Sequence, residues 1–286
     1  MNRRCCFLSM DSLAGYVSDD ELAIPALQEL GWNVETLSWS DPAADWNIYD
    51  AAIIRTTWDY QKWPERYLEV LADIERSRAR LLNPLTIVEW NLDKRYLREL
   101  ENSGVPIVPT IWKDGGISAG EFSEWQSALG SELIIKPTVS ATAHDTFRLV
   151  SFDSSLEATF ASRSFMVQPF VPAIVDEGEY SLFYFGGEYS HTILKSAVPG
   201  DFRVQEEYGG IITAVEPEAG LIESAQNVLR LIRDELLYAR IDLVRDTSGG
   251  FMLMELELIE PALYFRMDPD SPARFASAFD RMMNEL

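Results

Sequence analysis

The sequence predicts an α/β fold, and three features support that prediction. Short apolar runs rich in β-branched residues alternate with segments of helical periodicity along the chain. Hydrophobic residues make up 47% of the 286 positions, which is enough to bury a sizeable core. No internal repeat and no low-complexity linker interrupts the pattern, so we expect closely coupled lobes.

The first third of the chain alternates strands and helices. The expected strands are 4–10, 33–39, 51–56 and 80–83. The expected helices are 19–30 and 64–78, and Gly31 can supply the left-handed residue that ends the first of them.

The rest of the chain continues the alternation. In its first part we expect helices 85–103, 119–129 and 154–162 and strands 105–112, 132–137, 146–152 and 165–170. Two hairpins, 179–196 and 238–259, then flank a helix at 217–236. The last helix, 271–284, follows Ser271-Pro272, which suits an N-cap and a first helical position.

The formal net charge of −22 limits the partners. Neutralising phosphates needs a basic face, so we expect no nucleic acid and no anionic membrane surface. No apolar run reaches the roughly 18 residues of a membrane helix, and the N-terminal apolar stretch is too short for a signal peptide. Cys5 and Cys6 are adjacent and point to opposite faces of a strand, so a disulfide between them would be strained. We therefore expect a cytoplasmic protein with free thiols.

Several catalytic motifs are missing from the sequence. It has no G-x-x-x-x-G-K-[ST] phosphate loop, no G-x-G-x-x-G after the first strand and no G-x-S-x-G elbow. His144 and His191 are the only histidines, and no cysteines have ligand spacing, which argues against a zinc site.

Segment 238–260 carries the most informative chemical pattern. Residues 246–250 (DTSGG) predict a turn between two antiparallel strands. Alternation of side chains assigns one face to the core, with Ala239, Ile241, Leu243, Met252, Met254, Leu256 and Leu258. The opposite face then carries Arg240 and Asp242 beside Glu255 and Glu257, with Asp242 close to Glu255 across the pair.

Three carboxylates this close repel one another unless something positive lies between them. Oxygen ligands suit Mg²⁺, which binds a few carboxylates while phosphates and water complete its octahedron. The alternative is an ordinary solvated hairpin face. Because these carboxylates lie in a strongly apolar strand, the sequence favours a magnesium site at Asp242, Glu255 and Glu257.

A lysine ends a second apolar strand, at Lys136 in residues 133–137 (LIIKP). A lysine there costs desolvation unless an anion meets it. The next segment, 138–146, is small and polar, so it suits a flap over phosphates, although an ordinary hairpin loop would look similar. Lys94 is a second candidate cation.

Taken in order, these motifs resemble the ATP-grasp superfamily, and the likeness covers roughly residues 85–265. The motifs are residues 91–94 (NLDK), 135–137 (IKP), 166–171 (MVQPFV), 240–242 (RID) and 255–257 (ELE). The likeness is greatest to the group of prokaryotic glutathione synthetase, D-alanine–D-alanine ligase and ribosomal-protein glutamate ligases. Residues 55–60 and 201–210 resemble a subgroup that includes the O-ureidoserine cyclo-ligase of cycloserine biosynthesis. The implied architecture is an N-terminal α/β pre-grasp domain, 1–84, followed by two ATP-grasp lobes, 85–170 and 171–286.

The resemblance also implies roles for individual residues. Those implied to bind ATP are Lys94, Lys136, Ser140, the adenine-hinge residues Gln168, Pro169, Phe170 and Val171, and Glu179 at the ribose. Those implied to stabilise the transferred phosphoryl group and the acyl phosphate are Arg203 and Arg240. Those implied to bind Mg²⁺ are Asp242, Glu255 and Glu257. The sequence departs from the family at Glu257, where asparagine is common, and in its glycine-poor flap.

The implied function is ATP-dependent joining of a carboxylate to an amine, on a small amino-acid-like substrate, through an acyl phosphate. A ring-closing version, a phosphotransferase on the same fold and a non-catalytic nucleotide-binding module are the alternatives. The two lysines, two arginines and three carboxylates argue against the last. A homodimer is compatible with this interpretation.

The first domain offers a candidate substrate site. Arg55 lies at the carboxyl end of a buried strand, where ligands gather in open α/β sheets, and its planar fork fits a carboxylate. Trp58, Asp59 and Tyr60 follow, and they suit a small polar pocket with Asp59 available to an ammonium group. We expect Arg55 and Asp59 to bind the substrate, and the alternative is that Arg55 pairs with a neighbouring acid.

Overall fold

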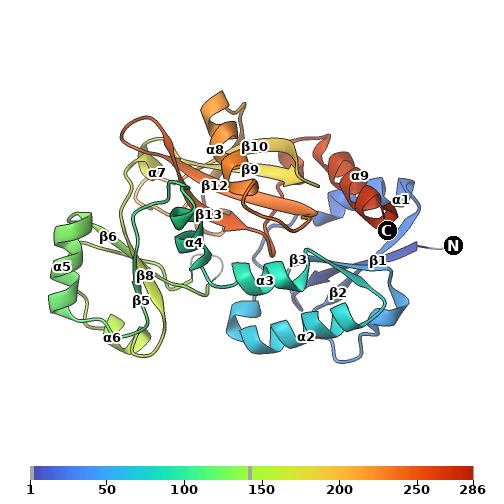
Figure 1. The fold of residues 1–286 in the computed structure, drawn as a ribbon, viewed down its shortest axis with the longest axis horizontal. Helices are drawn as coiled ribbons and strands as arrows, with labels where there is room; N and C mark the ends of the chain where they lie inside the picture. Colours follow the sequence, from blue (N-terminus) through green and yellow to red (C-terminus); the bar gives the residue numbers. More distant parts are fainter. Residues whose placement is uncertain (1–2, 141–143, 286) are drawn as a thin grey trace.

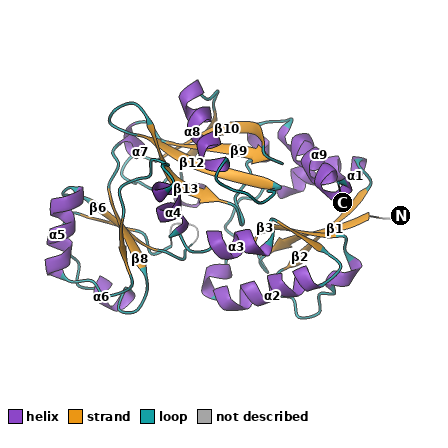
Figure 2. Ribbon diagram, in the orientation of Figure 1, coloured by secondary structure: helices purple, strands orange, loops and turns teal. Residues whose placement is uncertain are grey.

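The computed structural model describes residues 3–140 and 144–285. Its strands form three sheets, one for each successive part of the chain (Figures 1 and 2). Both chain ends lie on the side of the first sheet, to the right in Figure 1.

The first sheet is parallel and buried on both faces. Its strand order is β2-β1-β3-β4, with β1 Arg3–Ser9, β2 Trp32–Ser38, β3 Ala51–Thr56 and β4 Arg80–Leu82. Its α-helices are α1 Ile24–Glu29 and α2 Pro64–Arg76, and short 3-10 helices cover Asp20–Ala23, Trp46–Ile48 and Tyr60–Lys62. Cys5 and Cys6 are fully buried in two different hydrophobic clusters, which confirms that they face opposite sides of β1.

The second sheet is antiparallel and forms the lobe at the left of Figure 1. Its order is β5-β8-β6-β7, with β5 Ile111–Lys113, β6 Leu133–Pro137, β7 Phe147–Leu149 and β8 Phe165–Pro169. Helices α5 Ala119–Leu129 and α6 Leu156–Thr159 belong to this lobe, and α3 Leu85–Asn91 and α4 Tyr96–Asn102 precede it.

The third sheet is antiparallel and has the order β11-β10-β9-β12-β13. Its strands are β9 Glu179–Phe185, β10 Glu188–Ser196, β11 Ile211–Ala214, β12 Tyr238–Arg245 and β13 Phe251–Glu257. The accompanying helices are α7 Ala173–Asp176, α8 Ala219–Leu229, α9 Ser271–Asn284 and 3-10 turns at Glu206–Tyr208 and Phe265–Met267. Helix α9 packs against α1, and its apolar side chains join the core cluster shared by the first and third sheets (Figure 1).

Two expected elements of the middle region differ in the structure. The expected helix 85–103 is interrupted between α3 and α4, and the backbone N–H of Lys94 in that break donates to the carbonyl of Thr138 at 2.8 Å. The expected strand 105–112 shrinks to β5, because Pro106 and Pro109 have no N–H to donate to a ladder. Ile107 keeps only an isolated bridge to Leu253.

The prediction that Met252 and Met254 share the core face of Leu256 and Leu258 is wrong, and both are instead partly buried against a separate cluster that includes Val244. The register of the β12–β13 pair shifts between Asp242 and Leu243, so Leu243 pairs with Leu253 rather than with Met254. This bulge reverses the alternation along β13. Leu253 is therefore buried, and Met254 lines the cavity described below.

Smaller differences concern element ends. Strand β11 was not expected, and the expected helix 217–236 ends at Leu229. Asp270, not Ser271, precedes the first residue of α9, and the Ser271 hydroxyl donates instead to the carbonyl of Asp268 at 2.7 Å.

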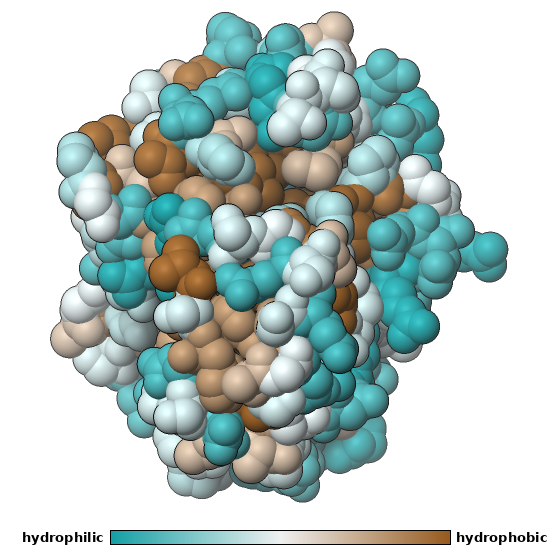
Figure 3. All heavy atoms as spheres, turned by 90° about the vertical axis from the view of Figure 1, so that its left-hand side faces the viewer, coloured by the Kyte–Doolittle hydropathy of each residue, from teal (hydrophilic) through white to brown (hydrophobic). Residues whose placement is uncertain are grey.

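The surface of the second lobe is mostly hydrophilic, with separate hydrophobic patches (Figure 3). Among the described residues, no helix combines the length and the apolar character needed to cross a membrane.

Candidate active site

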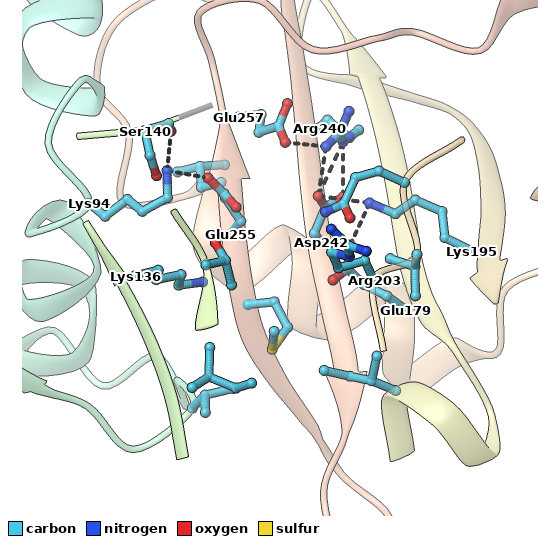
Figure 4. Close-up of a pocket in the computed structure, with 18 of the residues that line it drawn as sticks. Lys94, Lys136, Ser140, Glu179, Lys195, Arg203, Arg240, Asp242, Glu255 and Glu257 are labelled. Atoms are coloured by element: carbon cyan, nitrogen blue, oxygen red, sulfur yellow. Dashed lines mark hydrogen bonds and ion pairs between the residues drawn. The ribbon is translucent and has the colours of Figure 1, made fainter. Parts of the chain in front are cut away.

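One cavity gathers side chains from the second and third sheets and from the segment that follows β3 in the first domain. Trp58 and Tyr60 come from the first domain, Lys136 and Gln168 from the second sheet, and Asp242 from the third. Figure 4 shows the charged side chains of β12 and β13 pointing into the same space as Lys94 and Lys136.

The acidic hairpin has the expected cross-strand pairs. Asp242 lies opposite Glu255, and Arg240 lies opposite Glu257. Arg240 forms an ion pair with Asp242 at 2.9 Å and another with Glu257. Ser181 on β9 donates a further hydrogen bond to Asp242 at 2.6 Å. Burial opposes ionisation of Asp242, but Arg240 and a neighbouring lysine outweigh it and lower its pKa to about 2.

That neighbouring lysine is Lys195 on β10, which the sequence analysis missed. Its side chain is 3% exposed and is ion-paired with Asp242 at 3.1 Å and with Glu179. The signal was the one that singled out Lys136, a lysine inside an apolar strand. Recognising it required the pairing of β9 with both β10 and β12, which brings the three side chains together.

Lys94 and Ser140, both predicted to bind ATP, contact each other through the backbone of Ser140. The Lys94 ammonium donates to the Ser140 carbonyl at 2.7 Å and forms an ion pair with Glu255 at 2.8 Å. Burial tends to lower the pKa of Lys94. The adjacent Glu255 carboxylate more than offsets this effect, so the pKa of Lys94 is raised. Of the rest of the predicted flap, residues 141–143 lie outside the described residues.

Lys136, which is partly buried, differs from the cations described above. Its ammonium makes no hydrogen bond or ion pair with any residue that the structure describes. Burial lowers the pKa of Lys136, and Lys94 adds to that shift while Glu255 opposes it. An anion at this position would remove the cost of burying the ammonium.

Arg203 lines the cavity from the segment after β10. Its guanidinium forms an ion pair with Asp201 at 2.7 Å and stacks on the ring of Tyr208 at 3.7 Å. The contacts with Asp201 fix the orientation of the Arg203 guanidinium. The same contacts hold the pKa of the Asp201 carboxyl well below its usual range.

The predicted adenine-hinge residues also line the cavity, at the end of β8. Gln168 is buried, and its amide donates to Thr110 at 3.0 Å. The ring of Phe170 lies 3.7 Å from the guanidinium of Arg148. Pro169 and Val171 complete this wall. Glu179 is engaged by Lys195 beside Asp242, and its role at the ribose stays a prediction.

The three predicted metal ligands share one face without converging on one point. Among the residues the structure describes, no group of three Asp, Glu, His or Cys side chains is close enough to hold a metal ion alone. Each carboxylate is instead paired with a cation, as Figure 4 shows. The oxygen donors still fit Mg²⁺, because that ion uses one or two carboxylates together with substrate phosphates.

Two further glutamates have strongly shifted pKa values. Burial raises the pKa of Glu257 to about 7, with Asp242 and Glu255 adding to the shift against Arg240. Burial and Glu257 raise the pKa of Glu260 to about 8. Glu260 was not predicted as a site residue, because no local sequence pattern indicates that the chain after β13 turns along the cavity.

The structure does not bring Arg55 and Asp59 into the cavity lining. Arg55 is 1% exposed, and its guanidinium binds Asp20 at 2.9 Å and the carbonyl of Pro261 at 2.9 Å. Asp59 accepts a hydrogen bond from the Trp39 indole at 2.8 Å. The expectation that these two side chains face a substrate is therefore not supported by their placement, because each is occupied by other groups.

Comparison with known proteins extends this picture. A family model described as the N-terminal domain of D-cycloserine synthetase DcsG matches residues 5–83. Cycloserine biosynthesis protein DcsG of Streptomyces lavendulae is 32% identical over 276 residues, with 89% of this chain and 90% of that protein covered. The crystal structure of D-cycloserine synthetase DcsG superposes with a TM-score of 0.82 at 25% identity, over 98% of this chain and 100% of that one.

More distant structures share the fold. D-alanine–D-alanine ligase of Bacillus anthracis superposes with a TM-score of 0.68 at 15% identity, over 99% of this chain and 98% of that one. The ATP-grasp ligase PsnB, complexed with a phosphomimetic variant of its minimal precursor, Mg and ADP, superposes with a TM-score of 0.68 at 13% identity. The superposition covers 99% of this chain and 100% of that one. These matches confirm the expected α/β architecture, an N-terminal domain followed by the ATP-grasp fold. The chain therefore belongs to the ATP-grasp ligases, enzymes that form C–N bonds, and it is related to cycloserine synthetase.

Proposed function

We propose that the protein uses Mg-ATP to convert the carboxylate of a small amino-acid-like substrate into an acyl phosphate, which an amine then attacks. ADP and phosphate are released. The observation that carries this proposal is the set of five cations that line one cavity, Lys94, Lys136, Lys195, Arg203 and Arg240. Lys94, Lys195 and Arg240 are buried, and the other two are partly exposed. In a chain of net charge −22, such a set indicates an anionic substrate.

The chemistry needs activation, because a free carboxylate would have to expel oxide. Phosphorylation makes phosphate the leaving group instead. Mg²⁺, when bound by Asp242 and Glu255 together with the phosphates, would neutralise charge on the transferring group. Fixed charges around that group should supply most of the rate acceleration.

The positions of the cations suggest a different role for each of them. Lys136, which has no partner among the described residues, suits a phosphate of ATP. Arg240 bridges Asp242 and Glu257, so its guanidinium is held in a fixed position in the cavity and suits the acyl phosphate. Arg203 is oriented by Asp201 and Tyr208 and lines the same cavity.

The attacking amine needs little more than placement. No general base has been assigned, since a neutral amine is already nucleophilic once it is desolvated and held next to the acyl phosphate. Departure of phosphate then completes the amide bond. The excess proton leaves with the solvent.

A ring-closing reaction is the specific candidate within this class. The relative at 32% identity is a cycloserine biosynthesis protein, and the likeness extends over the N-terminal domain as well as the ATP-grasp lobes. In this version the amine and the carboxylate belong to one molecule, so the cavity needs to hold only one organic substrate besides ATP.

A screen of ADP release over amino acids and amino-acid analogues tests the proposal. The expected result is release of ADP that depends on one of these compounds, with free phosphate and a new amide as products. A phosphotransferase would leave a stable phosphorylated compound and no free phosphate. Absence of any amide among the products would contradict the proposal.

A further inference from the structure

We propose that Glu260 binds the ammonium group of the amino-acid-like substrate, between the aromatic walls of Trp58 and Tyr60. This inference rests on the proposed function and names the substrate group that the first domain helps to recognise. All three residues line the cavity.

The charges in the cavity leave Glu260 without a cation. Glu179 and Asp242 are paired with Lys195, Glu255 with Lys94, and Glu257 with Arg240. Within the described part of the chain, Glu260 forms no ion pair and accepts a side-chain hydrogen bond from Tyr60 only. Glu260 is partly buried, and a partly desolvated carboxylate without a cation is costly, so an incoming ammonium group is its natural partner.

The walls around Glu260 suit an ammonium ion. The Trp58 indole donates to the Glu260 carbonyl at 2.9 Å, which fixes the ring beside this residue. Tyr60 stacks on Tyr67 with ring centroids 4.9 Å apart, and both Trp58 and Tyr60 are buried. Aromatic faces attract desolvated cations, and here they accompany a carboxylate acceptor.

The same segment leads to the reacting end of the substrate. Two residues beyond Glu260, the carbonyl of Ala262 accepts from Arg240 at 3.4 Å. A substrate carboxylate is repelled by Glu260 and attracted by Arg240, so the two ends of an amino acid are sorted by charge. This orientation directs the carboxylate toward the cations proposed to stabilise the acyl phosphate.

Asp59, the acid of the first domain that was expected to bind the ammonium group, is less suited to the role. Asp59 accepts from the Trp39 indole and does not line the cavity. Glu260 therefore replaces Asp59 as the expected ammonium ligand.

Binding of two probes tests this assignment without requiring turnover. Calorimetry in the presence of Mg²⁺ and ADP compares D-cycloserine with isoxazolidin-3-one, the same ring without the amino group. The wild type should prefer D-cycloserine by about tenfold or more, as expected for a desolvated charge-assisted contact. Glu260→Gln should reduce the preference to about twofold or less, and Glu260→Asp, which keeps the charge, should retain part of it.

The matched control is Glu35→Gln. Glu35 also accepts from a tyrosine hydroxyl, that of Tyr49 at 2.8 Å, but it lies outside the cavity lining. This variant should keep the full preference. Unchanged affinity of Glu260→Gln for Mg-ADP shows that its nucleotide site is folded.

The assignment is overturned if the wild type shows no preference, if Glu260→Gln retains it, or if Asp59→Asn is the variant that loses it. ADP release measured in parallel separates the two proposals. Substrate-dependent ADP release with an unchanged preference in Glu260→Gln contradicts only the ammonium site. If Glu260→Gln loses the preference for D-cycloserine but the wild type forms no amide with any tested compound, only the proposed function is contradicted.

Discussion

The ammonium nitrogen of Lys195 lies 3.1 Å from a carboxylate oxygen of Asp242, and the two side chains are each 3% exposed. Glu179 meets the same ammonium from β9. Lys195 therefore holds two buried carboxylates at the position where the proposed function requires phosphate and metal chemistry.

Lys195→Met should remove this shared cation and destabilise the fold by about 3–5 kcal/mol, because two buried carboxylates lose their partner. Without Lys195, the pKa of Glu179, already raised by burial, should rise further. When the pKa of a carboxyl group is raised in the folded state, the contribution of that group to the free energy of unfolding falls as the pH increases through that pKa. The difference from wild type, measured by urea unfolding, should therefore shrink as the pH is lowered. A pH-independent difference would contradict this explanation.

Glu255→Gln should lower ADP release by about 100-fold or more, because a proposed Mg²⁺ ligand is lost. Like-charge repulsion alone would predict that the variant gains stability. The ion pair of Glu255 with Lys94 reverses that expectation, and the free energy of unfolding should fall by about 1.5–3 kcal/mol. Glu132→Gln is the control, since Glu132 pairs with Arg148 outside the cavity lining. Normal turnover of Glu255→Gln would remove Glu255 from the metal site.

Lys136→Ala should raise the dissociation constant of Mg-ATP at least tenfold, about 1.4 kcal/mol, as measured by calorimetry. The physical reason is that the Lys136 ammonium has no hydrogen-bond or ion-pair partner among the described residues. A phosphate of ATP would be its first anionic partner. Lys113→Ala provides the comparison, because Lys113 lies in the same lobe and is already paired with Glu121 at 2.7 Å. Equal Mg-ATP affinities of both variants would count against the assignment.

Gly210→Ala should reduce ADP release at least tenfold, about 1.4 kcal/mol in the barrier. A Cβ at Gly210 would lie 2.0 Å from the carbonyl oxygen of Val204, so the backbone next to Arg203 must move. Gly220→Ala is the matched substitution, since its Cβ meets only Phe251 at 3.9 Å. That variant should keep its activity and gain about 0.4–1 kcal/mol of stability in α8. Full activity of Gly210→Ala would show that the position of this segment does not matter for catalysis.

The sequence predicted the parts of the site that follow from strand alternation. The pairing of Asp242 with Glu255 came from locating one turn, and Lys136 came from a lysine within an apolar strand. It failed where the geometry depends on packing between distant segments. The contact of Arg55 with Asp20 and with the carbonyl of Pro261 joins segments that no local pattern connects. The bulge that turns Met254 into the cavity likewise leaves no simple mark on the alternation of β13.

The central claim is that the substrate carboxylate is activated as an acyl phosphate. The most direct measurement follows a heavy-oxygen label placed in the carboxylate of a compound that stimulates ADP release. Formation of an acyl phosphate transfers one of these oxygens to the γ-phosphoryl group, so the account predicts one labelled phosphate for every amide bond formed. Formation of the amide with release of unlabelled phosphate, the lost heavy oxygen appearing in water instead, would contradict the account.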